Sequence, residues 1–297
     1  MPRSPMFRAP VVVLALGSLT FAGAACGGDD DDDADVTAGP VEVQDAGAEG
    51  GRAQLPGAAA VGQTGSSSAT VGIVLSVDGS GVDQDVPVTL RLDYDAEVVE
   101  ADAGGYTVEN TFTGAEVLDG PDGADLSAVE DLVGVRYRET FNPDGTSGDN
   151  ELVDEGSLTD AQREAYEQFG SQVETASFDY PDEPVGVGAT WTSVSTIAQQ
   201  GFDLAVTYHY ELTALEGDDY TIEISYDEDI DDTVTSDGVE ADVTGTLQGG
   251  GTTVGRVGEP LAVDTSIEQH LDMDVDADGE SISMTMDVTV AVAPSAS

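Results

Sequence analysis

The stretch that decides the fold is FDLAVTYHYEL, residues 202–212. Its large apolar side chains occupy every second position, so a β-strand would place them all on one face and the polar residues on the other. A similar run, residues 220–226, follows after the turn sequence Gly217-Asp218-Asp219. Turn residues between two alternating runs predict an antiparallel hairpin, in which aromatic and β-branched cross-strand pairs contribute ~0.2–1 kcal/mol each.

The same alternation recurs on both sides of this hairpin. Strands are expected in residues 71–77, 86–94, 133–141, 239–247, 262–275 and 282–290, with a break at the glycines 249–251. A further hairpin is expected over residues 98–112, with its turn at residues 102–105. Two short helices are expected, one near residues 126–132 and one over about 160–173, where Thr159 and Gln162 can form a capping box. Residues 69–297 are therefore predicted to be a single, mainly β domain. It would be a large antiparallel meander of about ten strands, arranged as a curled half-barrel, a closed barrel or a sandwich.

Residues 1–25 have the composition of a signal peptide. Arg3 and Arg8 precede an apolar run at residues 11–16, and small residues follow up to Ala25. The run is too short to span a bilayer, so export is the better interpretation. Cys26 is the only cysteine of the chain, so an exported protein cannot use it for an intrachain disulfide.

The string Gly23-Ala24-Ala25-Cys26 resembles the lipobox of bacterial lipoproteins, although that family favours Leu at the place of Gly23. The resemblance implies cleavage before Cys26 and diacylation of its sulfur by chains such as palmitate. Two acyl chains would anchor the protein stably on the extracytoplasmic face of the cell membrane. The alternative is ordinary secretory cleavage after Ala24, which would leave a soluble protein with a free thiol.

Residues 26–68 are predicted to be a disordered acidic linker. They begin with an aspartate block at residues 29–33 and contain no aromatic residue and no sustained periodicity. Such a segment buries too little apolar surface to offset the entropy of ordering it. As a flexible coil of about 40 residues it would span roughly 35 Å and hold the domain clear of the membrane.

The charge of the chain excludes several classes of function. The net charge is −52 and there is no lysine, and removal of residues 1–25 takes away two arginines and no acid, so the mature protein carries −54. A P-loop lysine, a Schiff-base lysine and a Ser-Lys dyad are therefore absent, and a polyanion repels nucleic acid. The acidity has two interpretations: a solvated surface adapted to high salt, or carboxylates that bind calcium.

The phrase PDEPVGVGATW, residues 181–191, resembles uncharacterised actinobacterial envelope lipoproteins, in which a β-rich domain follows a lipobox and an acidic linker. The likeness extends to most of residues 69–297 and implies an envelope location but no activity. A more remote likeness is to the curved carrier sheets of lipoprotein-sorting and mycobacterial lipid-transfer lipoproteins. This second likeness implies a fold alone.

Asp274, Asp276 and Asp278 are weak candidates for a metal site. With Gly279 they copy the first six places of a helix-loop-helix calcium loop, but the twelfth place holds Thr285 instead of Glu, and the flanking residues alternate as in strands. An Asp-Gly hairpin turn explains the same residues without metal. No cofactor is predicted; calcium is the one metal that the sequence suggests.

Each of the two histidines has a carboxylate two residues away: Glu211 follows His209, and Glu268 precedes His270. A shared strand face would bring each pair together, as acid–base or metal chemistry requires. Two histidines form a poor zinc set, however, and no nucleophile elbow, zinc-protease motif or dinucleotide glycine loop occurs. The chain is therefore predicted not to be an enzyme.

Two functions remain in view. The first is a lipoprotein whose sheet holds an apolar or amphiphilic ligand in its concavity, and the residues that would bind that ligand are not identified by the sequence. The second is a structural or protein-interaction domain with an acidic, calcium-binding surface and an envelope protein as its partner. A cavity of at least ~300 Å³ is what the first hypothesis requires.

Overall fold

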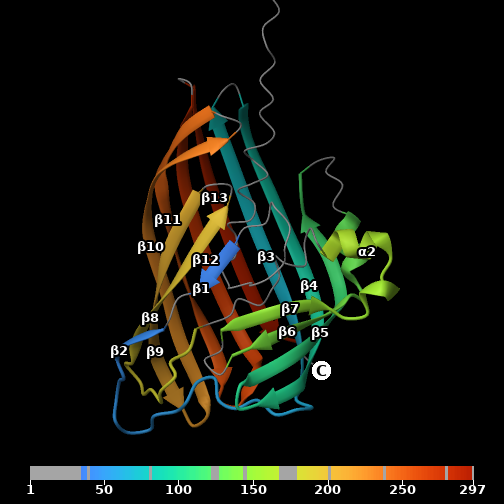
Figure 1. Ribbon diagram of the computed structural model, residues 1–297, viewed down its shortest axis with the longest axis vertical. Helices are drawn as coiled ribbons and strands as arrows, with labels where there is room; N and C mark the ends of the chain where they lie inside the picture. Colours follow the sequence, from blue (N-terminus) through green and yellow to red (C-terminus); the bar gives the residue numbers. More distant parts are fainter. Residues whose placement is uncertain are drawn as a thin grey trace, which may run out of the picture.

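The protein is an open antiparallel β-sheet of thirteen strands (Figure 1). The computed structural model describes residues 35–38, 41–79, 82–121, 127–142, 146–166, 179–199, 202–236, 239–277 and 280–295. The predicted mainly β class and the antiparallel meander are confirmed. Because all strands belong to one sheet that does not close on itself, the closed barrel, one of the three predicted arrangements, is wrong.

The strands are long, and the central ones exceed the usual length of a strand in a globular protein. Their bounds are β1 (Asp35–Ala38), β2 (Glu42–Asp45), β3 (Thr64–Gly79), β4 (Val82–Asp102), β5 (Gly105–Asp119), β6 (Arg136–Phe141), β7 (Ser147–Leu152), β8 (Thr190–Gln199), β9 (Phe202–Glu216), β10 (Asp219–Ser236), β11 (Val239–Arg256), β12 (Glu259–Ala277) and β13 (Glu280–Pro294).

The spatial order is β1-β8-β9-β10-β11-β12-β13-β3-β4-β5-β6-β7, and β2 also pairs with β8. The sheet thus consists of two meanders, β3 to β7 and β8 to β13, which are joined by the pairing of β13 with β3. In Figure 1 the central strands form the back wall, while β8 and β9 on the left and β5 to β7 on the right curve in front of it. This curl brings distant strands onto one core: Leu204 of β9 and Met284 of β13 belong to the same buried cluster, although three strands separate them.

Two helical segments lie where the sequence predicts them, and a third, of three residues, was not predicted. They are the 3-10 helices η2 (Ser127–Leu132) and η3 (Glu155–Ser157) and the α-helix α2 (Asp160–Ala165). The capping box is confirmed, since Thr159 Oγ1 accepts a hydrogen bond from the Gln162 amide and Gln162 Oε1 accepts one from the Thr159 amide, both at 3.1 Å. Ala165 packs into a cluster with the apolar face of β4 to β6, so these helices cover that part of the sheet. Residues 167–173, the end of the predicted second helix, lie outside the described residues.

The prediction of a disordered linker over residues 26–68 is wrong for residues 35–38, which form β1, and for residues 41–68. Strand β2 lies within it, β3 begins at Thr64, and Leu55 is fully buried. Val43 pairs with Trp191 of β8. Leu55 packs in the aromatic cluster that contains Trp191. This segment has few apolar residues, and it is ordered because several of them, Val43 and Leu55 among them, pack in a core built by the distant strands β8 to β10. Cys26 and the aspartate block lie outside the described residues.

Candidate functional site: the inner face of the sheet

Three rows of side chains cross the inner face of β10, β11, β12, β13 and β3. The strand registers place them as follows, in that strand order: Glu228, Leu247, Leu271, Met286 and Leu75; then Ile230, Gly245, Met273, Met284 and Val77; then Asp232, Val243, Val275, Ile282 and Gly79. We call these rows the trough. Apart from the two acids of β10, every side chain in the trough is apolar.

The trough is only partly covered. Met273 and Met284 are buried in its middle row, and Leu204 and Val206 of β9 belong to the same cluster. Four further apolar residues pack against that cluster but remain partly exposed: Leu75, Val77, Val275 and Ile282. The strand spacing of ~4.8 Å makes the floor about 19 Å wide from β10 to β3. An apolar surface of this extent, solvated in part, is where an apolar ligand would gain most from burial.

The trough has an open edge along β10. The ladder between β9 and β10 ends at the pair His209 and Ser225, whereas β10 continues to pair with β11 as far as Ser236. Beyond the last pair, the Thr207 amide donates a hydrogen bond to Oε1 of Glu228 at 2.8 Å, so a side chain replaces the next main-chain acceptor. In Figure 1, β10 and β11 extend well past the tips of β8 and β9. Among the described residues, β10 therefore has a free edge beside the trough.

The other end of the inner face is filled by aromatic residues. Trp191 stacks on Tyr210 with ring centroids 5.4 Å apart, and the hydroxyls of Tyr180 and Tyr220 lie 3.1 Å apart. Burial is the main cause that raises the pKa of each of these three tyrosines above its ordinary value. Leu55 closes this cluster. This end of the inner face is a packed core.

A buried carboxylate lies on the inner face of β6. Glu139 of β6 is 1 % exposed and shares the inner face with Tyr137 and Phe141. With burial as the larger cause, its charge helps to raise the pKa of Tyr94 to about 12, against the opposing effect of the Ser67 hydrogen bond. The sequence reasoning missed this residue. The alternation in RYRETF, residues 136–141, places Glu139 between two aromatic residues on one face and could have found it.

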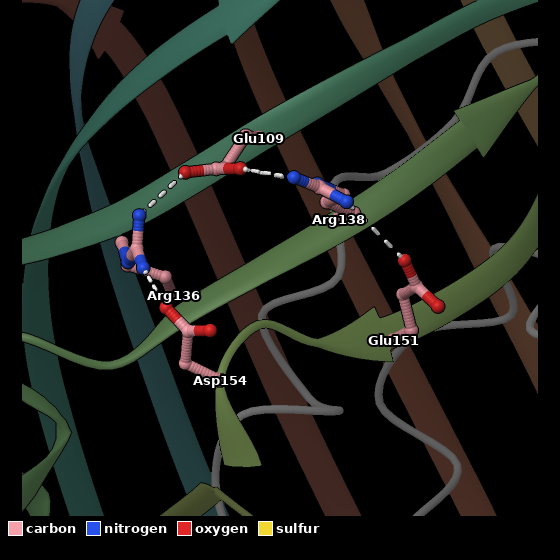
Figure 2. A network of polar contacts seen from close by, with 5 residues as sticks. All are labelled: Glu109, Arg136, Arg138, Glu151 and Asp154. Atoms are coloured by element: carbon pink, nitrogen blue, oxygen red, sulfur yellow. Dashed lines mark hydrogen bonds and ion pairs between the residues drawn. The ribbon is translucent and has the colours of Figure 1, made fainter. Parts of the chain in front are cut away.

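The outer face is acidic, and its arginines are neutralised locally. Glu109 of β5 is 18 % exposed and lies between two arginines of β6, 2.9 Å from Arg136 and 3.0 Å from Arg138 (Figure 2). Arg136 also contacts Asp154, and Arg138 lies 3.7 Å from Glu151. Every arginine in the described strands forms an ion pair with an acid. These arginines are Arg91, Arg136, Arg138 and Arg256.

Both histidines line one outer groove of about 850 Å³ over β9 to β13. His270 Nδ1 lies 2.7 Å from Asp287, and Glu268 lines the same groove, as the sequence pairing of His270 with Glu268 predicts. His209 is three strand spacings away from His270, or about 14 Å at ~4.8 Å each, so the two imidazoles cannot share one metal ion. Gly250 forms part of the floor, where the absence of a side chain hollows the surface.

The predicted metal residues lie in a strand rather than in a loop. Asp274 and Asp276 belong to β12 and pair with Ser283 and Ser281 of β13. The Ser283 hydroxyl donates a hydrogen bond to Asp274. Asp278 lies outside the described residues. Within the described part of the chain, no three histidine, cysteine or acidic side chains converge to hold a metal ion.

Residues 162–253 match the model of a family of unknown function, DUF6263. The match is less than half of the chain and runs from α2 through β8, β9, β10 and most of β11. No curated protein matches the sequence. Among the described residues, no helix has the length and apolar character needed to cross a membrane.

Proposed function

We propose that this chain is a non-enzymatic envelope lipoprotein whose β domain holds an apolar or amphiphilic molecule in the trough. The observation that carries the proposal is the set of partly exposed apolar side chains on the floor of the trough, which include Leu75 and Val77 of β3 and Ile282 of β13. A soluble domain gains stability by burying such a surface, and a ligand with an alkyl chain can supply the cover.

The proposed location follows from the N-terminal sequence. Residues 1–25 have the pattern of an export signal, and Cys26 is the proposed site of diacylation on the outer face of the cell membrane. A protein tethered there meets amphiphiles that leave the bilayer. The net charge of −52 favours a domain that stays in solution above an anionic lipid surface, because like charges repel.

The anchor is tested by membrane fractionation and mass spectrometry of the full chain expressed in a bacterial host. The wild type is expected in the membrane fraction, cleaved before Cys26, with the mass of two acyl chains added. Cys26→Ser should move the protein to the soluble fraction. Cleavage after Ala24 in a soluble wild type would overturn the anchor and leave the ligand proposal standing.

The ligand is tested by native mass spectrometry of protein purified without organic solvent. An adduct of several hundred daltons that disappears after organic extraction is expected. Val77→Phe fills the trough and should remove the adduct. Val74→Phe is the matched control, because Val74 lies on the same strand but is 41 % exposed on the outer face. A bare mass for the wild type, or equal loss in both variants, would overturn the carrier.

The outer face favours a second function, that of a protein-interaction domain with an acidic surface. The observation in its favour is the groove of about 850 Å³, into which Asp227, Glu268 and Asp287 bring three carboxylates. Chemical crosslinking in cells to an envelope protein, lost in Asp227→Asn/Glu268→Gln and retained in Val77→Phe, would select this function over the carrier.

A further inference from the structure

We infer that the trough selects amphiphiles with a positively charged head group over neutral or anionic amphiphiles with the same tail. This inference rests on the proposed ligand-binding function and adds the chemical class of the ligand. The juxtaposition that carries it is an apolar floor with two carboxylates, Glu228 and Asp232, at the open edge formed by β10.

The two acids face the trough rather than the solvent on the outer side. Glu228 pairs with Leu247 and Asp232 pairs with Val243, and both of these partners are buried apolar residues of the inner face. Both acids are half-buried, whereas Asp229 and Asp231, which alternate with them on β10, are exposed on the outer face. Alternation is the property that fixes this assignment, because adjacent residues of a strand point to opposite faces.

No cation of the described strands shares the trough with these acids. The remaining members of the three rows are uncharged, and the four arginines of the strands form ion pairs with acids elsewhere, Arg91 with Asp93 and Arg256 with Asp219 among them. An anionic head beside either acid would therefore meet a carboxylate and no counter-charge. A cationic head beside either acid would be attracted to it in a partly dry site, where charge attraction is stronger than in water.

The open edge gives the head group and the tail separate places. Glu228 already accepts one hydrogen bond, from the Thr207 amide, and a carboxylate has capacity for further donors on its two oxygens. Asp232 lies four residues further along β10, about 13 Å from Glu228 at ~3.4 Å per residue, so each acid can meet a head group by itself. The tail would lie across the row toward Met284 and Val77 of β13 and β3.

The test is isothermal titration calorimetry of the full chain with three amphiphiles of equal tail length: dodecyltrimethylammonium, dodecyl maltoside and dodecanoate, each below its micelle concentration. We expect the ammonium compound to bind about tenfold more tightly than the maltoside, and dodecanoate to bind most weakly. The titrations are repeated at about 1 M salt, where a Debye length of ~3 Å removes most of the attraction from distant surface charge.

The decisive variant is Glu228→Gln/Asp232→Asn, in which the Gln amide oxygen can still accept from Thr207. Its affinity for the ammonium compound should fall about tenfold, to that of the maltoside. Asp229→Asn/Asp231→Asn removes the same charge from the outer face of the same strand, and at high salt it should change the affinity less than twofold. Equal losses in the two variants, or equal affinities for the three head groups, would overturn the inference and leave the carrier intact. If no amphiphile binds to the wild type, both the carrier and the inference fail.

Discussion

The ring of Tyr226 lies over Gly249, the residue that faces it on the neighbouring strand β11. A Cβ atom at position 249 would stand 2.3 Å from the Tyr226 hydroxyl oxygen, which donates a hydrogen bond to Gln269 Oε1 at 2.9 Å. Tyr220 covers Gly255 in the same way. The predicted break at glycines 249–251 is wrong, because β11 runs through them. Gly249 and Gly255 instead leave room for aromatic rings of β10.

This packing predicts that Gly249→Ala destabilises the domain by about 1–3 kcal/mol, the usual cost of forcing an extra carbon into a packed site. The measurement is urea unfolding followed by circular dichroism. Gly156→Ala is the control, because a Cβ at position 156 meets no atom within 4 Å. Equal stability of the two variants would show that Tyr226 can move away at no cost.

Buried tyrosines make the domain sensitive to alkali. Burial raises the pKa of Tyr94 from 10.0 to about 12 and raises those of Tyr106, Tyr208, Tyr210 and Tyr226 as well. Above about pH 10 the unfolded chain loses these protons while the folded chain keeps them, so the folded state binds more protons and its stability falls as the pH rises.

We therefore expect the urea midpoint to be constant from about pH 8 to 9 and to fall steeply between about pH 10 and 12. Tyrosinate absorbance should appear together with the loss of β-sheet circular dichroism. Tyr94→Phe should reduce the slope by the share of one group. Full tyrosine ionisation at about pH 10 in a chain that stays folded would contradict the burial of these hydroxyls.

The ion-pair network of Figure 2 predicts a specific role for Glu109. Glu109→Gln leaves Arg136 and Arg138 without their shared carboxylate and should cost about 1 kcal/mol, since partly exposed pairs contribute ~0.2–1 kcal/mol each. Glu151→Gln removes the same charge from a pair 3.7 Å apart and should change the stability by less than about 0.5 kcal/mol. The difference between the variants should shrink at about 1 M salt. Equal effects at low salt would mean that only net charge matters.

Local patterns predict the elements of this fold but not their arrangement. The alternation around Tyr208 and the capping box of Thr159 depend on neighbours in the sequence, and both are confirmed. The pairing of β13 with β3 joins residues more than two hundred places apart, and no local pattern specifies it. The order of residues 41–63 depends on the same long-range contacts, because Leu55 is buried only once the aromatic cluster exists.

The candidate site could be predicted in part. Period two in residues 220–234 assigns Glu228 and Asp232 to the apolar face of β10, so the acids of the trough can be found from the sequence. The free edge beside them cannot, because it depends on where β9 leaves β10. The two histidines show the same limit: their carboxylate neighbours are local, whereas their shared groove requires the order of β9 to β12.

The acidity itself leads to the last prediction. A net charge of −52 destabilises a compact chain by self-repulsion, and salt screens it, so sodium chloride should raise the thermal midpoint steadily up to about 1 M. At equal ionic strength, calcium should raise it no more than magnesium, because no three acidic side chains converge in the described part of the chain. An additional rise with calcium that disappears in Asp274→Asn/Asp276→Asn would instead establish a metal site at the end of β12. Asp229→Asn/Asp231→Asn, which removes the same charge from the exposed face of β10, is the control that separates a site from general screening.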